Sequence, residues 1–247
     1  MKQNKYDDPD FFQRYSQMPR SVDGLHAAGE WSVFRSLLPV LADKNVLDLG
    51  CGFGWHCRYA REQGARYVVG VDLSANMLAR ARSTTNDPAI EYRQTAIEDI
   101  DFAPGSFDVV ISSLALHYVE QLETVYRKVY DCLTPGGAFV FSAEHPVFTA
   151  IATQDWYYDA AGNRLHWPVD HYQAEGIRQT HFLDNAVVKY HRTLATHINA
   201  LVAAGFRITG AAEPKPSDEV LAAYPEMKDE VRRPIFLLLA AVKPGSK

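Results

Sequence analysis

The strongest chemical signal in the sequence is a glycine-rich segment, NVLDLGCGFGWH, in which an apolar run ends at Asp48 and continues into three glycines, Gly50, Gly52 and Gly54. Glycines at these positions let the main chain turn sharply and let a ligand lie directly against it. A helix predicted to begin just after the loop would offer unpaired N–H groups to a carboxylate or a phosphate. The spacing is GxGxG, and Trp55 stands where the GxGxxG pattern of nicotinamide and flavin enzymes has its third glycine, so a bound pyrophosphate is disfavoured.

A second acidic residue fits the same kind of site. Asp72 lies 22 residues beyond Gly50, at the end of the apolar run YVVGVD. An acidic residue at the tip of the second strand is placed to accept hydrogen bonds from a ribose diol. The two acidic strand ends and the glycine loop therefore predict one nucleoside-binding site.

Three further segments complete a recognisable order. IEYRQTAIEDIDF is typical of a third strand and adenine loop, FDVVISSLALHYVE of a fourth strand with an active-site edge, and LTPGGAFVFS of the turn before a fifth strand. Together with the glycine loop and Asp72, they resemble the class I S-adenosylmethionine-dependent methyltransferases over about residues 46–142. The resemblance implies S-adenosylmethionine as cofactor and S-adenosylhomocysteine as product.

The resemblance also implies a role for each residue around the loop. Asp48 and the backbone from Gly50 to Gly54 would hold the methionine end of the cofactor, and Asp72 would hold the ribose. Ala96 stands where family members often carry an acid or amide for the adenine amino group, so Glu98 is expected to substitute for it. The other expected cofactor contacts are the filler Cys51, the adenine flank Leu73 and Met77, the backbone N–H of Ile97, and Ser113, Tyr15 and Arg20.

Two histidines are candidates for chemistry on the methyl acceptor. His117 follows the fourth strand, and His145 follows the fifth, so both are expected at the carboxyl edge of the sheet where open α/β sheets bind ligands. The ordinary pKa of histidine suits a general base near neutral pH. The residues expected to contact the acceptor are Tyr118, Trp156, Tyr190, His191 and Arg192.

These residues need a scaffold of alternating strands and helices, and the sequence predicts one. Short apolar runs alternate with helical segments, which indicates a mainly parallel sheet covered by helices on both faces. The expected fold is α/β: a Rossmann-like, doubly wound, seven-stranded sheet with an antiparallel last strand. The expected strands are 45–49, 67–72, 90–94, 107–112, 138–143, 206–212 and 235–242, with helices after Gly54, Ser74, Tyr118 and Thr193.

One domain is expected for residues 1–247, in four parts. Residues 1–44 form a helical cap with helices at 10–18 and 27–38, and residues 45–143 form the cofactor-binding core. Residues 144–192 are far longer than an ordinary α/β connection of about 2 to 6 residues. Their aromatic content predicts an ordered lid that determines the acceptor, with a hairpin turn at Asp184–Asn185; residues 193–247 return to the core.

Composition narrows the function further. A formal net charge of -5 and the absence of any long basic run disfavour nucleic acid as a partner. The longest apolar run, 235–242, is far below the roughly 18 residues of a membrane helix, and we expect no membrane association and a cytoplasmic location. Three cysteines without a CxxC pair and scattered histidines predict neither a disulfide framework nor a metal site. A monomer or homodimer is expected.

A small molecule is the expected acceptor. Ser112-Ser113-Leu114-Ala115 stands where base-directed amino methyltransferases carry an Asn or Asp followed by two prolines and an aromatic residue. Two alternatives stay open: a cofactor-binding scaffold that has lost turnover, and a less favoured NAD(P)-dependent oxidoreductase.

Overall fold

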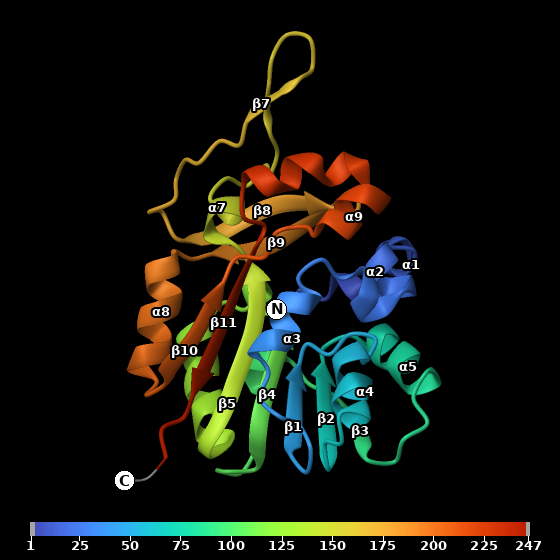
Figure 1. Cartoon of the computed structure of the whole chain (residues 1–247), viewed down its shortest axis with the longest axis vertical. Helices are drawn as coiled ribbons and strands as arrows, with labels where there is room; N and C mark the ends of the chain where they lie inside the picture. Colours follow the sequence, from blue (N-terminus) through green and yellow to red (C-terminus); the bar gives the residue numbers. More distant parts are fainter. Residues whose placement is uncertain (1–2, 246–247) are drawn as a thin grey trace.

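The computed structural model describes residues 3–245, so the ends of the predicted cap and C-terminal part, residues 1–2 and 246–247, lie outside the described residues. A central seven-stranded sheet has the order β10-β11-β5-β4-β1-β2-β3 (Figure 1). Its strands are β1 (Asn45–Leu49), β2 (Tyr67–Asp72), β3 (Ile90–Gln94), β4 (Phe107–Ser113), β5 (Leu133–Glu144), β10 (Arg207–Ala212) and β11 (Phe236–Val242).

The pairing of these strands confirms the predicted fold class. β1 pairs in parallel with β2 and β4, β4 with β5, and β2 with β3. β11 runs antiparallel to both of its neighbours, β5 and β10. The largest difference in a boundary is at β5, which begins at Leu133 and not at residue 138; the ends of β4, β5, β10 and β11 otherwise differ by one residue. The predicted turn TPGG is an irregularity within the strand, where Phe107 pairs with Leu133 but Val109 already pairs with Ala138.

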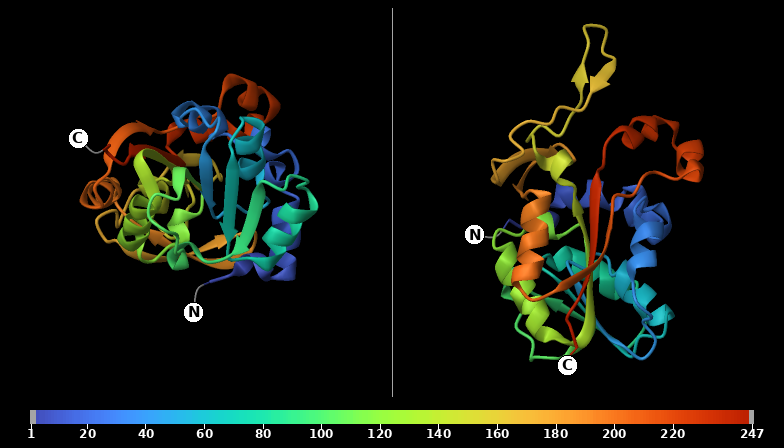
Figure 2. Two further views of the ribbon diagram at one scale, coloured as in Figure 1. Left: turned by 90° about the horizontal axis from the view of Figure 1, so that it is seen from below. Right: turned by 60° about the vertical axis from the view of Figure 1, so that its left-hand side comes forward.

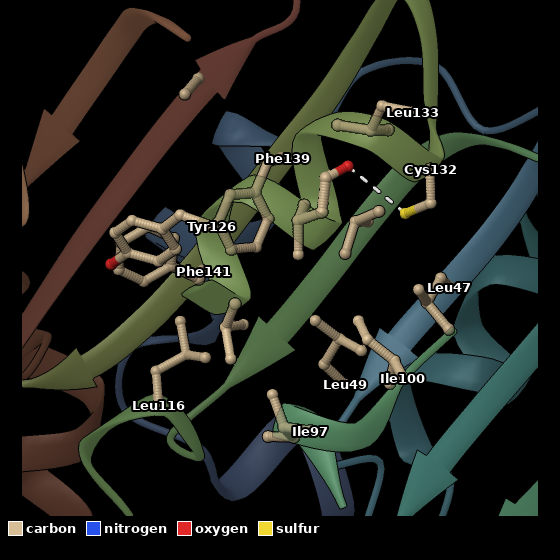
Figure 3. Packing of buried hydrophobic residues seen from close by; sticks show 14 of the residues in the cluster. Leu47, Leu49, Ile97, Ile100, Leu116, Tyr126, Cys132, Leu133, Phe139 and Phe141 are labelled. Atoms are coloured by element: carbon tan, nitrogen blue, oxygen red, sulfur yellow. Dashed lines mark hydrogen bonds between the residues drawn. The ribbon is translucent and has the colours of Figure 1, made fainter. Parts of the chain in front are cut away.

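Helices cover both faces of the sheet, as the two core clusters show. Leu47, Leu49, Phe139 and Phe141 point to the face covered by α6 (Leu122–Cys132) and α8 (Leu194–Ala203) (Figure 3). Alternate residues such as Val46, Val140 and Leu238 point to the other face, where α3 (Trp31–Leu37), α4 (Trp55–Glu62) and α5 (Ala75–Ser83) pack. The alternation of strand side chains thus produces two apolar layers.

Helix starts follow the capping residues. Ser74 accepts from the N–H of Met77 at the start of α5, and Thr193 accepts from the N–H of Thr196 at the start of α8. The N-terminal cap differs from its prediction in detail: it forms η1 (Lys5–Asp7), α1 (Pro9–Ser16), α2 (Pro19–Val22), η2 (Gly24–Ala27) and α3. The predicted helix 27–38 begins only at Trp31, because the chain first makes the 3₁₀ turn η2.

The long insertion after β5 forms a short helix and two hairpins. These are α7 (Pro146–Thr149), β6 (Tyr157–Tyr158) with β7 (Arg164–His166), and β8 (Gly176–Phe182) with β9 (Asn185–His191). The second hairpin turns at Leu183 and Asp184, one residue before the predicted step, and both have positive φ values (53° and 61°). The β6–β7 hairpin projects away from the rest of the molecule (Figures 1 and 2).

The C-terminal part adds α9 (Asp218–Ala223) and η5 (Pro225–Arg232), and the cofactor-binding core also contains η3 (Ile97–Asp99) and η4 (Leu116–Tyr118). Within residues 3–245, no helix is both long enough and apolar enough to cross a membrane.

The close approach of Tyr92 to Gly54 in the glycine loop gives a stability prediction. Gly54 has φ +75°, and a Cβ there would lie 2.1 Å from the Tyr92 hydroxyl oxygen; Gly105 has φ +69° with open space around it. Both alanine variants carry left-handed strain of about 1–2 kcal/mol. Gly54→Ala must also displace Tyr92, so it should lower the free energy of unfolding by about 1–3 kcal/mol more than Gly105→Ala in urea titrations. Equal losses in the two variants would contradict the close approach.

Candidate active site

The carboxyl ends of the central strands open into one large cavity of about 1010 Å³. Its walls come from the N-terminal cap, the glycine loop, the ends of β2, β4 and β5, and the β8–β9 hairpin. In Figure 1 the cap helices α1 and α2 and the β8–β9 hairpin lie at the end of the sheet to which the arrowheads of β1, β2 and β5 point. The chain thus forms a single covered space where the sequence predicts its site.

Asp72 organises the cofactor end of this cavity. One carboxylate oxygen accepts from the N–H of Gly52 (2.9 Å) and the other from the N–H of Ser74 (2.9 Å). Burial raises the pKa of this carboxyl, and the two backbone hydrogen bonds act in the opposite direction. A carboxylate oxygen can accept more than one hydrogen bond, so both oxygens keep capacity for a ligand hydroxyl in the cavity.

Only part of the glycine loop lines the cavity. Gly50, Cys51 and Gly52 line the cavity. Gly54 and Asp48 lie behind the loop: Asp48 is 1% exposed, and its Oδ2 accepts from the Cys57 thiol (3.2 Å). Asp48 is therefore not part of the cavity wall, and its contact with a ligand stays a prediction.

Asp48 is nevertheless an unusual group. Its Oδ1 has no hydrogen-bond partner among the described residues, and burial raises its pKa to about 7. Buried polar atoms in native proteins normally have a hydrogen-bond partner, so this oxygen is an exception.

Most of the other predicted cofactor contacts do line the cavity. Ile97 and Met77 flank the loop, because a Cβ on Gly50 would lie 3.4 Å from Ile97 Cδ1, and one on Gly52 would lie 4.0 Å from Met77 Cε. The remaining predicted residues on the cavity wall are Leu73, Glu98, Ser113, Tyr15 and Arg20. Arg20 donates to Glu30 (2.6 Å), and that pairing holds it at the cavity wall.

Residues 3–8 add two features that no sequence motif predicts: Tyr6 on the cavity wall, and Asp7 at the start of α5. Tyr6 lies edge-on to Tyr15 and Tyr118, with ring centres 5.0 and 6.3 Å away, and its hydroxyl is 3.4 Å from that of Tyr118. Asp7 accepts from the Ser74 hydroxyl (2.5 Å) and from the N–H of Asn76 (3.0 Å) at the start of α5. Because these partners lie about 70 residues away along the chain, no local motif indicates the contact.

The opposite wall of the cavity is polar and was only partly predicted. His117 and Tyr118 line it, and they are joined by Glu144, Lys189 and Gln154. Lys189 donates to Glu144 (2.5 Å) and to Gln154 Oε1 (3.1 Å), and Gln154 Nε2 donates to the second Glu144 oxygen (3.1 Å). The strand period could have indicated Lys189, because it shares the buried face of β9 with Val187 and His191.

The protonation state of His117 differs from that of a general base. The N–H of Glu144 donates to its Nδ1 (3.4 Å), so the proton of the neutral ring lies on Nε2. Burial lowers its pKa to about 4, against the opposing charge of Glu144. His117 therefore presents an N–H donor near neutral pH, and not a proton acceptor.

Four predicted acceptor or catalytic residues lie away from the large cavity. His145 caps α7 through Nδ1 and bonds Glu213 through Nε2 (2.8 Å), so both of its nitrogens are engaged. His191 is held by Thr149 (2.7 Å) and by the carbonyl of Tyr172 (2.9 Å). These hydrogen bonds hold both buried rings away from the wall of the large cavity.

Arg192 and Trp156 are also engaged elsewhere. Arg192 donates to the carbonyls of Val119 (2.7 Å) and Glu120 (2.6 Å). Trp156 lines a separate cavity of about 310 Å³ together with Arg232 and Trp167. Of the four acceptor contacts predicted within the lid, Trp156, Tyr190, His191 and Arg192, only Tyr190 lines the large cavity.

The histidine states give a pH prediction. Burial lowers the pKa of His117 to about 4 and that of His197 to about 3. Between these values and about 6.5 the unfolded chain binds more protons than the folded chain, so the free energy of unfolding should fall as pH is lowered through this window. Asp48, with its pKa raised to about 7, and Asp72, whose pKa burial also raises, act in the opposite direction. Burial lowers the pKa of His56 to about 3 as well, so three histidines outweigh the two carboxyls.

Histidine NMR titrations of the folded protein measure this directly. The rings of His117 and His197 should stay neutral, and the proton of the His117 ring should stay on Nε2, down to about pH 5. A folded-state midpoint near 6.5 for either ring would contradict the assignment.

Comparison with known proteins agrees with this geometry. Residues 47–141 match the family model described as a methyltransferase domain. A Listeria monocytogenes structure assigned to the S-adenosylmethionine-dependent methyltransferases is 53% identical, covers 89% of this chain and 99% of its own, and superposes with a TM-score of 0.85. A Mesorhizobium loti S-adenosylmethionine-dependent methyltransferase is 47% identical over 89% of this chain and 100% of its own, with a TM-score of 0.83.

A third relative shares only part of its length. The malonyl-[acyl-carrier protein] O-methyltransferase of Enterobacter lignolyticus is 37% identical over 54% of this chain, and the match spans 49% of that enzyme. The two structural matches over 89% of the chain, the methyltransferase family match and the glycine loop with Asp72 at the end of a seven-stranded sheet agree: the chain belongs to the class I S-adenosylmethionine-dependent methyltransferases.

Proposed function

We propose that this protein transfers the methyl group of S-adenosylmethionine to a small-molecule acceptor held between the glycine loop and the β8–β9 hairpin. The observation that carries the proposal is the cavity of about 1010 Å³ lined at one side by Asp72 and Gly52 and at the other by Lys189 and His117. One small ligand usually occupies about 300–1000 Å³, so a cavity at the top of this range has room for a cofactor together with a modest acceptor.

At the cofactor end, the residues present fit a nucleoside with an amino-acid tail. The free lone pairs of Asp72 suit the two ribose hydroxyls, and Met77, Leu73 and Ile97 provide apolar surfaces for a base. Arg20 carries the positive charge that a carboxylate tail requires, and Trp55 and His56, the first residues of α4, line the same cavity. Bound there, S-adenosylmethionine supplies an electrophilic methyl group on a sulfonium.

At the acceptor end, the protein's contribution is orientation and exclusion of water. Tyr6, Tyr15 and Tyr118 cover the cavity with aromatic rings, which also favour a nearby sulfonium charge by roughly 0.5 to 2 kcal/mol per good contact. Holding two reactants in line can supply roughly 7 to 11 kcal/mol of the barrier reduction. A scaffold without turnover has no need of the buried Lys189–Glu144 wall.

The acceptor is assigned to the lid as a whole, residues 144–192, with the β8–β9 hairpin as the part that meets it. The β6–β7 hairpin projects away from this space (Figure 2). The malonyl-[acyl-carrier protein] O-methyltransferase, as one relative, favours an acceptor with a carboxylate, although the chain spans only about half of that enzyme. Net charge of -5 continues to disfavour a nucleic acid acceptor.

Ligand stabilisation tests the cofactor assignment. S-adenosylmethionine or S-adenosylhomocysteine at about 100 times its dissociation constant should add roughly 2.7 kcal/mol, which corresponds to about 5–10 °C in melting temperature for a chain of this size. NAD should give no such shift in the same thermal melt. Stabilisation by NAD, or no response to millimolar S-adenosylmethionine, would overturn the assignment.

Asp72→Asn tests the ribose contact within a folded protein. Asparagine keeps one acceptor oxygen for a backbone N–H of the loop, but it removes the charge that strengthens bonds to the ribose hydroxyls. Calorimetry should show binding of S-adenosylhomocysteine weakened by about 1.5–3 kcal/mol. Unchanged affinity in a variant with a native melting transition would rule out this role for Asp72.

A further inference from the structure

A buried ion pair forms part of the polar cavity wall that contains His117 and Tyr118, which we call the acceptor wall. Glu144 is the last residue of β5, and Lys189 lies in the lid strand β9; their side chains are 13% and 3% exposed and 2.5 Å apart. Gln154 bridges the pair, and the Thr180 hydroxyl donates to Gln154 Oε1 (3.0 Å). The pair is thus a fixed feature that joins the lid to the core sheet.

Stability alone gives little reason for such a pair. Removing two charges from water is costly, and buried ion pairs are often no more stable than apolar residues of similar volume. Here the pair also lines the cavity beside His117. A costly ion pair at this position is better explained by recognition of a ligand.

The hydrogen-bond capacity of this wall shows which kind of ligand fits. Both Glu144 oxygens are engaged, one by Lys189 and one by Gln154. An ammonium has three donors, and Lys189 uses two of them on Glu144 and Gln154 among the described residues. His117 accepts at Nδ1 and therefore carries its proton on Nε2. The wall accordingly offers donors to the cavity, while its carboxylate is already occupied.

The other carboxylates on the cavity wall lie on different elements. Asp72 ends β2 and is bonded to the glycine loop, Glu98 and Asp99 belong to η3, and Glu120 is exposed after η4. In the described chain, the bonds of the Lys189–Glu144–Gln154 network involve none of Asp72, Glu98 and Glu120. The local chemistry beside His117 is therefore set by donors.

Building on the proposed function, we propose that the methyl acceptor is an oxygen that already carries negative charge, as in a carboxylate or an ionised phenol or enol, bound by Lys189 and His117. A lone pair of that oxygen forms the new O–C bond while the C–S bond breaks, and its electron pair remains on the sulfur of the neutral product. No proton moves, so the reaction requires no base. An amine acceptor would place an ammonium, or a nitrogen that must lose a proton, against two donors.

Matched probes test this in the complex with S-adenosylhomocysteine. Benzoate and benzylamine, and 4-nitrophenolate and 4-nitroaniline, present similar scaffolds with an oxygen anion or a nitrogen. Titration calorimetry should show each oxygen anion binding at least about tenfold more tightly than its nitrogen counterpart, as expected for charged hydrogen bonds. With S-adenosylmethionine, mass spectrometry should detect the O-methyl ester or ether as the product of any probe that is turned over.

A paired variant removes the ion pair without leaving a lone buried charge. Lys189→Met combined with Glu144→Gln keeps side-chain volume and leaves the net charge unchanged. The control is the same pair of changes at exposed positions, Lys215→Met combined with Glu219→Gln. The double variant should bind S-adenosylhomocysteine as the parent does but bind the oxygen anions roughly 10- to 100-fold more weakly, whereas the control should match the parent.

The outcomes separate two failures. If the nitrogen probes bind as well as or better than the oxygen anions, or if the double variant binds the anions as the parent does, the inference is overturned. If the parent protein does not bind S-adenosylhomocysteine, that result would instead overturn the proposed function.

Discussion

The Asp72 carboxylate is the contact on which the geometry of the site depends. It accepts one N–H from the glycine loop and one from the start of α5, and the Ser74 hydroxyl at that helix start donates to Asp7 of the N-terminal cap. The glycine loop and the N-terminal cap, both distant in sequence, are thereby fixed relative to the end of β2 and the helix start that follows it. Because the loop and the helix start are already held, the cofactor end of the cavity is pre-organised, which lowers the ordering cost of binding.

The same constraint explains how the cap and the lid meet over the cavity. Tyr6, beside Asp7, packs against Tyr118 at the acceptor wall, and the Gln3 amide oxygen accepts from the N–H of Val188 in β9 (2.7 Å). Arg14 pairs with Asp184 at the hairpin turn (2.5 Å), although both side chains are exposed and the pair adds little stability. The N-terminal segment thus contacts both the cofactor end and the lid.

Local signals in the sequence predict the strands, the helix starts and the cofactor loop well. Apolar runs such as 67–72, the cap residues Ser74 and Thr193, and the glycine spacing each depend on neighbours in the chain, which the sequence displays directly. The acceptor wall is different. Glu144 and Lys189 are 45 residues apart, and only the tertiary path of the lid brings them together.

His145 also shows that local sequence signals do not predict which side chains reach the cavity. Its position after β5 correctly places its backbone at the carboxyl edge of the sheet, but its side chain is captured by Glu213, 68 residues later. His117 was correctly placed at the cavity, yet its protonation state depends on the backbone N–H of Glu144 and on burial. Residue type and order predict where a strand ends, whereas hydrogen bonds from distant segments decide which side chains face the ligand.

The most direct measurement of the central claim is a crystal structure of the protein with S-adenosylhomocysteine bound. Both ribose hydroxyls should donate to Asp72 while its bonds to Gly52 and Ser74 persist, and the sulfur should face the side of the cavity formed by His117 and Lys189. A ligand bound away from the glycine loop, or a sulfur directed away from that wall, would contradict it.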